Sequence, residues 1–229
     1  MENKKFLQQE KRWVYRLLML IAGFYGGYAM LVRGGAFSNA QTGNIVLLMM
    51  SLGKGEWGKA AYYVIPFVAY LAGTVLSELL VTRDRVAGRF RWSTLLILCQ
   101  LLLVALMGFI PAAAPYQICQ IIINVICAMQ FNTFRQAEGI PITTTFCTNN
   151  VRLMGVYMAG LFRKDNEKKE QRSKLLFYTE MVAYFALGVL ISTVACRAVS
   201  TYAIWLLLIP LSVLFVSFLR ADLKDEISV

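Results

Sequence analysis

Long apolar segments separated by short polar links dominate the sequence and predict membrane-spanning helices. A helix needs about 20 apolar residues to cross the hydrocarbon core of a bilayer. Six segments come close to this length, and Trp and Tyr residues suited to the headgroup region stand near several of their ends. The predicted spans cover residues 15–32, 57–81, 92–110, 115–134, 175–196 and 202–219. The predicted fold is therefore all-α, a polytopic bundle of membrane helices with six transmembrane spans.

Basic residues in the links predict the orientation of these spans. Five Lys and Arg residues stand at or before the start of the first span, four Arg residues follow the second, and six basic residues occupy positions 163–174. By contrast, the links at 111–115 and 196–201 carry no basic residue and one, respectively. Because short loops rich in Lys and Arg stay in the cytoplasm, we expect six crossings with both termini cytoplasmic.

Two shorter segments interrupt this pattern. Each begins with a stretch of mostly polar residues, which we call its polar lead, and continues as a short apolar run. Residues 37–53 read FSNAQTGNIVLLMMSLG, and residues 143–162 read TTTFCTNNVRLMGVYMAGLF. If the first were a full crossing, the arginine-rich link at 83–91 would lie outside, against the charge rule. We therefore expect two short half-helices that enter and leave the membrane on one side, with a bundle of eight crossings as the alternative.

Similarity between these two segments predicts an internal repeat. The same spacing of 106 residues separates Thr42 from Thr148 and Asn44 from Asn150. Since each half contains three crossings, the second half would be inverted in the bilayer. The predicted halves are residues 15–110 and 115–219 of a single membrane domain, residues 1–229.

The starts of the half-helices form the candidate functional site. Discontinuous helices leave backbone N–H groups unpaired, and in inverted repeats such ends meet near the midplane. Thr42 and Thr148 are expected to be the N-caps, and the positive ends of the helix dipoles favour an anion or a neutral solute rich in acceptors. The predicted substrate pathway comprises Gln41, Thr42, Gly43, Asn44, Asn124, Gln130, Thr148, Asn149 and Asn150. Ordinary capped turns without a ligand are the alternative explanation.

Polar residues within the spans also allow two interpretations. Gln120 and Asn124 share one face of the fourth predicted span and either line a solute path or form interhelical hydrogen bonds. Glu78 and Glu180 either relay a proton or pair with nearby basic residues. The glycine pair in the first span, GFYGG, predicts close packing within the molecule rather than a dimer face.

Composition narrows the possible function classes. Of the 229 residues, 58% are hydrophobic, 16% are charged and none is histidine, which excludes imidazole catalysis and zinc sites with nitrogen ligands. The five cysteines form no CxxC pair, which favours apolar packing over metal binding. The net charge of +10 comes from residues at the ends of spans, so it indicates topology rather than nucleic-acid binding. We expect no metal and no cofactor.

Two longer stretches of sequence carry a resemblance to a known family. They read GFYGGYAMLVRGGAFSNAQTGNIVLL and MQFNTFRQAEGIPITTTFCTNN, and they resemble the signature regions of the YoaK-like family of bacterial membrane proteins, also called DUF1275. The resemblance implies a multi-span inner-membrane protein and gives no particular substrate. Many similar members carry an acidic residue in the first span where this sequence has Gly26 or Gly27, and the family's second Thr-Gly is Thr148-Asn149 here.

The expected function is that of a channel or secondary transporter for a small anionic or neutral solute. Its expected partners are the lipid bilayer and that solute, with a homo-oligomer left open. The alternative is a non-transporting accessory or sensor protein that docks a partner through the basic link at 163–174. An enzyme is not expected, because the sequence places no cluster of carboxylates, cysteines or histidines at one depth.

Overall fold

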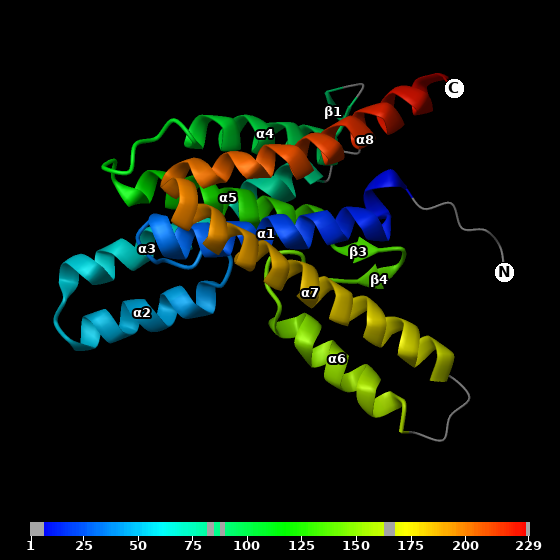
Figure 1. The fold of residues 1–229 in the computed structure, drawn as a ribbon, viewed down its shortest axis with the longest axis horizontal. Helices are drawn as coiled ribbons and strands as arrows, with labels where there is room; N and C mark the ends of the chain where they lie inside the picture. Colours follow the sequence, from blue (N-terminus) through cyan, green and yellow to red (C-terminus); the bar gives the residue numbers. More distant parts are fainter. Residues whose placement is uncertain (1–6, 82–84, 88–89, 163–167, 228–229) are drawn as a thin grey trace.

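The molecule is an elongated bundle of helices (Figure 1). The computed structural model describes residues 7–81, 85–87, 90–162 and 168–227. Its helices are η1 (Gln8–Glu10), α1 (Arg12–Val32), α2 (Gln41–Gly53), α3 (Trp57–Val81), α4 (Trp92–Met107), α5 (Tyr116–Thr133), α6 (Thr148–Gly160), α7 (Lys168–Val199), η2 (Ser200–Leu207) and α8 (Leu208–Ile227). Two short antiparallel hairpins are made by β1 (Arg85–Ala87) with β2 (Phe90–Arg91) and by β3 (Gln136–Ala137) with β4 (Ile140–Pro141). The predicted all-α class is confirmed.

Each predicted span coincides with helical structure. The second predicted span and α3 share both boundaries, residues 57 and 81. The fifth span is longer than predicted, because α7 begins at Lys168 with two turns that are too polar to be recognised by hydropathy. The sixth begins as the 3₁₀-helix η2 and continues as α8. Apolar content therefore locates the helices, while their polar extensions need the structure.

Three helical stretches among the described residues are long and apolar enough to cross a membrane: Arg12–Val32, Trp57–Leu80 and Lys168–Lys224. The last stretch contains α7, η2 and α8, and Figure 1 shows that the chain folds back between α7 and α8. A shorter apolar helix, α4, spans 16 residues. These helices support a membrane location, and the count of six crossings stays a prediction.

The helices of the two halves of the chain pair in the same way. If α1, α2, α3 and α4 are matched to α5, α6, α7 and α8, the contact of α1 with α7 corresponds to that of α5 with α3. Likewise, α2 packs on α3 as α6 packs on α7, and α4 packs on α8. This is the pairing expected of two related halves, although the orientation of each half in a bilayer stays a prediction.

Small residues allow the closest of these helix contacts. A Cβ atom added at Gly23 would lie 2.0 Å from the Phe185 carbonyl oxygen, and one at Gly188 would lie 2.0 Å from the Leu20 carbonyl oxygen. These backbones of α1 and α7 therefore touch directly. In the matching pair, Gly73 of α3 faces the backbone of α5. The glycines of the first span pack within the molecule, as predicted.

The half-helices α2 and α6 lie at the periphery and run from the middle of the bundle toward opposite ends (Figure 1). Their apolar side chains are largely exposed. The buried residues of α2 are Asn44 and Ser51, and the buried residue of α6 is Asn150. Both helices therefore turn apolar faces outward, while the opposite faces pack on α3 and α7 and a buried asparagine lies near each start.

The described ends of the chain lie at one end of the bundle, which we call the terminal end (Figure 1). The other end, where α1 stops and α5 starts, is called the opposite end. At the terminal end, the turn between β3 and β4 holds the start of the chain: the Glu138 N–H donates to the Glu10 carbonyl at 2.8 Å, and the Arg12 N–H donates to Glu138 Oε1 at 3.0 Å.

Candidate functional site

The two half-helix starts are capped differently from the prediction. The N-cap residues are Ala40 and Cys147, and neither makes a side-chain capping bond. Thr42 and Thr148 already lie inside the helices and are exposed. The predicted capping by these threonines is therefore wrong, because each helix begins at or before the threonine.

Asparagine side chains fix the polar leads instead. The Phe37 N–H donates to Asn44 Oδ1 at 2.9 Å, and Asn44 Nδ2 donates to the Phe37 carbonyl at 2.7 Å. In the second half, Thr143 Oγ1 donates to Asn150 Oδ1 at 2.9 Å, and Asn150 Nδ2 donates to the Thr143 carbonyl at 3.0 Å. Each asparagine is fully buried and binds the residue seven positions earlier, so each lead folds back on its half-helix.

A chain of amide hydrogen bonds connects α2 to α5. Asn44 Nδ2 donates to Gln41 Oε1 at 3.0 Å, Gln41 Nε2 donates to Asn124 Oδ1 at 2.8 Å, and Asn124 Nδ2 donates to the Gln120 carbonyl at 2.8 Å. Gln120 Nε2 in turn donates to the Arg33 carbonyl at 2.6 Å. Among the predicted pathway residues, Gln41, Asn44 and Asn124 are thus brought together.

The lead of α6 also contacts α5, at a residue that follows Asn124 in the sequence. Gln130 Nε2 lies 3.4 Å from the Thr144 carbonyl and 3.3 Å from the Leu18 carbonyl of α1. Gln130 stands six residues after Asn124 on α5, about 9 Å along the axis at 1.5 Å per residue. The lead of α2 therefore contacts the middle of α5, whereas the lead of α6 contacts its last turn.

Several buried polar atoms of the leads have no hydrogen-bond partner among the described residues. The hydroxyls of Ser38 and Thr144 are in this group, as are the amide oxygens of Gln120 and Gln130 on the adjacent helix α5. Ser38 and Thr144 are separated by the same 106 residues as the two asparagines. An unpaired buried polar group costs about 1–3 kcal/mol, and Ser38 and Thr144 are the unpaired hydroxyls that occupy matched positions of the two leads.

The remaining predicted pathway residues lie away from this centre. Gly43 packs against the Phe37 ring, which a Cβ atom would approach to 2.6 Å. Asn149 accepts hydrogen bonds from Arg152 at 3.1 Å and helps to line a cavity of 330 Å³ that also includes Thr143 and Arg135. The exposed Thr42 and Thr148 belong to the outer surface of the half-helices.

Arg33 is a buried cation that the sequence analysis missed. Its side chain is fully buried, and its guanidinium donates to the Tyr28 hydroxyl at 3.0 Å and to the carbonyls of Ile110 and Pro111 at 2.9 and 3.1 Å. These carbonyls follow the end of α4, where the negative end of the helix dipole favours a cation. Arg33 therefore ties the end of α1 to the link between α4 and α5 at the opposite end.

Ion pairs join the matched helix pairs at the terminal end. Glu180 of α7 lies 2.5 Å from Arg12 and 2.5 Å from Arg16, both of α1. Glu78 of α3 lies 2.7 Å from Arg135, just after α5. Each carboxylate thus has a basic partner on another segment, which favours the pairing interpretation over a proton relay.

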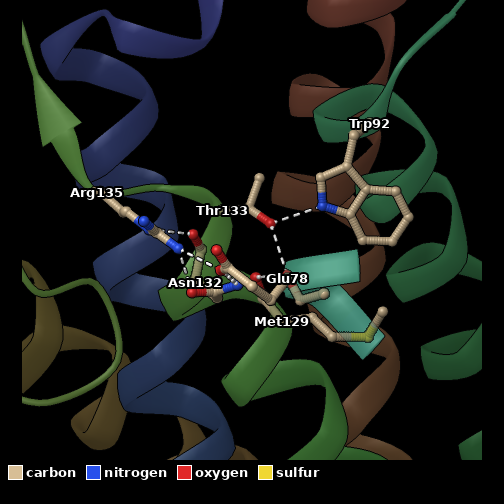
Figure 2. Close-up of polar contacts among 7 residues, drawn as sticks. Glu78, Trp92, Met129, Asn132, Thr133 and Arg135 are labelled. Carbon is tan, nitrogen blue, oxygen red and sulfur yellow. Dashed lines mark hydrogen bonds and ion pairs between the residues drawn. The ribbon is translucent and has the colours of Figure 1, made fainter. Parts of the chain in front are cut away.

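Figure 2 shows the surroundings of the ion pair between Glu78 and Arg135. Glu78 accepts from both Arg135 and Asn132, and Asn132 also accepts from Arg135. Beside them, Trp92 Nε1 of α4 donates to Thr133 Oγ1 at 2.9 Å. The terminal ends of α3, α4 and α5 are therefore joined by polar contacts.

Metal binding finds no support in the described part of the chain, which contains no group of three His, Cys, Asp or Glu residues arranged around a common point. The five cysteines are free. The chemistry available at the leads is therefore that of neutral hydroxyls and amides, together with the backbone N–H groups of the half-helix starts.

Comparison with known proteins gives a consistent match along the chain. The family described as "Protein of unknown function (DUF1275)" matches residues 14–217. The curated "UPF0700 transmembrane protein YoaK" of Bacillus subtilis (strain 168) is 24% identical over 215 residues, covering 91% of this chain and 92% of that protein. No solved structure matches.

Proposed function

The chain belongs to the DUF1275 family, and from this premise we propose that it is a channel or secondary transporter for a small solute. The solute is anionic or neutral and passes through a polar site near the bilayer midplane, between the leads of α2 and α6. The observation that carries this proposal is the pair of buried hydroxyls without a partner, Ser38 and Thr144, at matched positions of the two leads. A solute would supply their missing partners.

The membrane setting supports a function for these leads. Irregular backbone at membrane depth is tolerated where protein buries it or where it lines a watery cavity. In transporters with inverted repeats, such broken segments bind the substrate at the interface of the repeats. The leads of α2 and α6 have this form, since both contact α5, the first at its middle and the second at its last turn, and their half-helices run toward opposite ends (Figure 1).

The proposed orientation places the terminal end in the cytoplasm of a bacterial cell, with the protein as a multi-pass component of the inner membrane. Arg12, Arg16 and Arg135 are at this end, and basic residues of short links favour the cytoplasmic side. The half-helix α2 would then approach from outside and α6 from the cytoplasm, and the two repeats would be inverted.

The chemistry of the leads supports the proposed solute class. Hydroxyls and backbone N–H groups donate hydrogen bonds, and the N-terminal ends of α2 and α6 carry partial positive charge. The amide oxygens of Gln120 and Gln130 accept hydrogen bonds from a neutral solute. A bare cation would gain little here, since neither lead contributes a carboxylate in residues 37–44 or 143–150.

Passage through this site requires movement. Hydrogen bonds of Asn44, Gln41 and Asn124 tie the lead of α2 to α5, and Gln130 binds the lead of α6. We propose that the structure represents a closed state, and that sliding of α1 with α7 against α3 with α5 opens access to one side at a time, as in other transporters built from repeats.

Flux measurements on proteoliposomes test this proposal. Swelling and efflux are measured with a panel of neutral polyols, amides and small anions. For a solute that the unmodified protein passes, Ser38→Ala combined with Thr144→Val is expected to lower flux at least fivefold, because the solute loses two hydrogen-bond partners of about 0.5–1.5 kcal/mol each. The matched control, Thr42→Val combined with Thr148→Val, changes exposed residues and should leave flux unchanged. Equal flux in all three proteins, or no flux for any solute, contradicts the proposal.

The alternative function, docking of a partner by a non-transporting protein, rests on the start of α7. Residues 163–167 of the basic link lie outside the described residues. Lys168, Lys169 and Arg172 form an exposed basic surface on the first turns of α7, beyond the predicted span. A stoichiometric partner that co-purifies with the protein, and is lost when these three residues are changed to Gln, would favour this function.

A further inference from the structure

Arg33 carries a positive charge that its own contacts do not balance. The guanidinium donates three hydrogen bonds, to the Tyr28 hydroxyl and to the carbonyls of Ile110 and Pro111, and all three acceptors are neutral. The dipole of a helix end corresponds to about half a unit charge, so the carbonyls that follow α4 offset only part of it. A buried charge is costly unless an opposite charge pairs with it, and ionisable residues inside membrane proteins are typically functional.

Carboxylates are far from this cation. Glu56 is the only acidic residue of three stretches that the structure describes in full: 11–77, 90–137 and 181–221. Glu56 itself pairs with Lys59 at 3.0 Å. Along α1, 17 residues separate Arg33 from Arg16, the last residue of this helix that pairs with a carboxylate, about 25 Å at 1.5 Å per residue. None of the ion pairs among the described residues includes Arg33.

The lead of α2 begins directly after this cation. Ser38 follows Arg33 by five residues, so their Cα atoms are at most about 18 Å apart. Gln120 Nε2 donates to the Arg33 carbonyl at 2.6 Å, and the same glutamine belongs to the chain of hydrogen bonds that leads through Asn124 to Gln41. The charge of Arg33 is therefore next to the proposed pathway on the side of α2.

A charge in this place favours an anion in the pathway without touching it. At a separation of about 15–20 Å and an effective dielectric constant of about 20, the Coulomb energy of two opposite unit charges corresponds to an about four- to sixfold change in binding. A neutral solute gains no such energy. Because salt screens buried charges much less than exposed ones, the preference should persist at high ionic strength.

We propose that Arg33 makes the pathway selective for small monovalent anions over neutral solutes of equal size. This inference rests on the proposed function and narrows its substrate class. The anion accepts hydrogen bonds from the Ser38 hydroxyl and from backbone N–H groups at the start of α2, where the N-cap Ala40 makes no side-chain bond. The guanidinium stays bound to its carbonyls and acts through its electric field.

A structural clamp with no effect on selectivity is the competing explanation, since Arg33 also ties α1 to the link before α5. Tyr28→Phe weakens the same region, because it removes a hydroxyl that accepts from Arg33 and donates to the Thr201 carbonyl, but it keeps the charge. Arg33→Gln removes the charge. The two variants therefore separate the effect of charge from that of local structure.

Isotopic exchange in proteoliposomes at pH 8 tests the inference. Each labelled anion is compared with the amide of nearly equal size: formate with formamide, acetate with acetamide and lactate with lactamide. Equal concentrations on both sides prevent net movement of charge, and protein-free liposomes give the background. The unmodified protein should exchange at least one of these anions about fourfold faster than its amide, or more. Arg33→Gln should lower this ratio about four- to sixfold and leave exchange of a permeant amide within twofold, whereas Tyr28→Phe should keep the ratio.

Three results would overturn the inference while the proposed function stands: amide exchange as fast as anion exchange in the unmodified protein, an unchanged ratio in Arg33→Gln, or an equal fall of the ratio in Tyr28→Phe. Absence of exchange for every anion overturns it as well. The polyol and amide fluxes then decide separately whether the proposed function survives.

The burial of Arg33 allows a second test that does not depend on the folding of Arg33→Gln. In the unmodified protein, the ratio of anion to amide exchange should change less than twofold between about 0.1 M and about 1 M salt. Lys54→Gln combined with Lys59→Gln removes exposed charges of the turn between α2 and α3 and should also change the ratio less than twofold. A ratio that falls to one in high salt or in the lysine variant would assign the selectivity to exposed charges and overturn the role of Arg33.

Discussion

Asn150 repeats, 106 residues further along the chain, the hydrogen bond that Asn44 donates to the carbonyl seven residues before it, and its Oδ1 accepts from the Thr143 hydroxyl where Asn44 Oδ1 accepts from a backbone N–H. Each side chain is fully buried, each binds the residue seven positions before it, and each stands in the first turn of a half-helix. Few other residues of α2 and α6 are buried. Each asparagine therefore fixes the start of its half-helix, while packing on α3 or α7 holds the rest of the helix.

Replacement of these asparagines is expected to destabilise the protein. Asn44→Leu keeps the approximate volume but leaves the Phe37 backbone N–H and carbonyl without their partners, and Asn150→Leu does the same to the Thr143 carbonyl and hydroxyl. We expect each change to lower the free energy of unfolding by about 1–3 kcal/mol. Denaturant titration in mixed micelles measures this effect.

The matched controls for this experiment are the neighbouring threonines. Thr42→Val and Thr148→Val alter exposed positions of the same two helices, and each should change the stability by less than about 0.5 kcal/mol. If the threonine variants were as unstable as the asparagine variants, the anchoring role of Asn44 and Asn150 would be refuted.

The sequence allows prediction of much of the helical framework. Apolar runs bounded by Trp57 and by the arginine-rich link define α3 at both ends, because membrane helices must be apolar over about 20 residues. Apolar length likewise locates α1, α4 and α5 within about three residues at each end. It fails at the start of α7, where Lys168 and its neighbours are helical but polar, and at the end of α8, which continues to Ile227, eight residues beyond the predicted span.

The details of the site are less predictable, since they depend on contacts between distant segments. The sequence identified Gln41 and Asn124 as polar residues in apolar surroundings, but it could not show that they bind each other. Thr42 has a residue type typical of helix N-caps, yet the helix begins before it. The burial of Arg33 depends on carbonyl groups 77 and 78 residues away, and no local pattern indicates it.

Close backbone contact between α1 and α7 predicts that Gly23 tolerates no side chain. Gly23→Ala would place a methyl group against the Phe185 carbonyl, and only movement of the two helices could relieve the overlap. We expect a loss of stability of about 1–3 kcal/mol. Gly155→Ala of α6 is the control, because a Cβ atom there has no neighbour within 4 Å and should stabilise the helix by up to about 1 kcal/mol. Loss of stability in both variants would point to a general intolerance of glycine replacement.

The number of crossings can be measured by labelling single cysteines. On a background without the five native cysteines, Lys54→Cys marks the turn between α2 and α3, and Lys169→Cys marks the start of α7. With six crossings, an impermeant maleimide added to intact cells labels Lys54→Cys and not Lys169→Cys, because α2 returns to the outer side. Lys169→Cys should react only after permeabilisation. With eight crossings, Lys54→Cys would be protected in intact cells, and the inverted arrangement of the halves would have to be abandoned.

The ion pairs of Glu180 predict which side of the molecule is held closed. At the terminal end, Glu180 joins α7 to Arg12 and Arg16 of α1, whereas at the opposite end the Tyr28 hydroxyl of α1 donates to the Thr201 carbonyl of η2 at 3.0 Å, and the described residues form no ion pair between α1 and α7 there. Removal of the charge at residue 180 should therefore favour opening at the terminal end.

Labelling of the α6 lead in inside-out vesicles measures this opening. Thr144→Cys is buried beside Thr143, which lines the cavity of 330 Å³ near the terminal end. Glu180→Gln should raise its labelling rate about two- to fivefold, because partly exposed ion pairs contribute about 0.2–1 kcal/mol. Glu170→Gln removes an equal charge, but its partner Lys174 lies on the same helix, so the rate should not change. An equal labelling rate in both variants would show that the Glu180 ion pairs do not control access to Thr144→Cys. In that case, the contact between α1 and α7 at Glu180 would not resist the separation of these two helices.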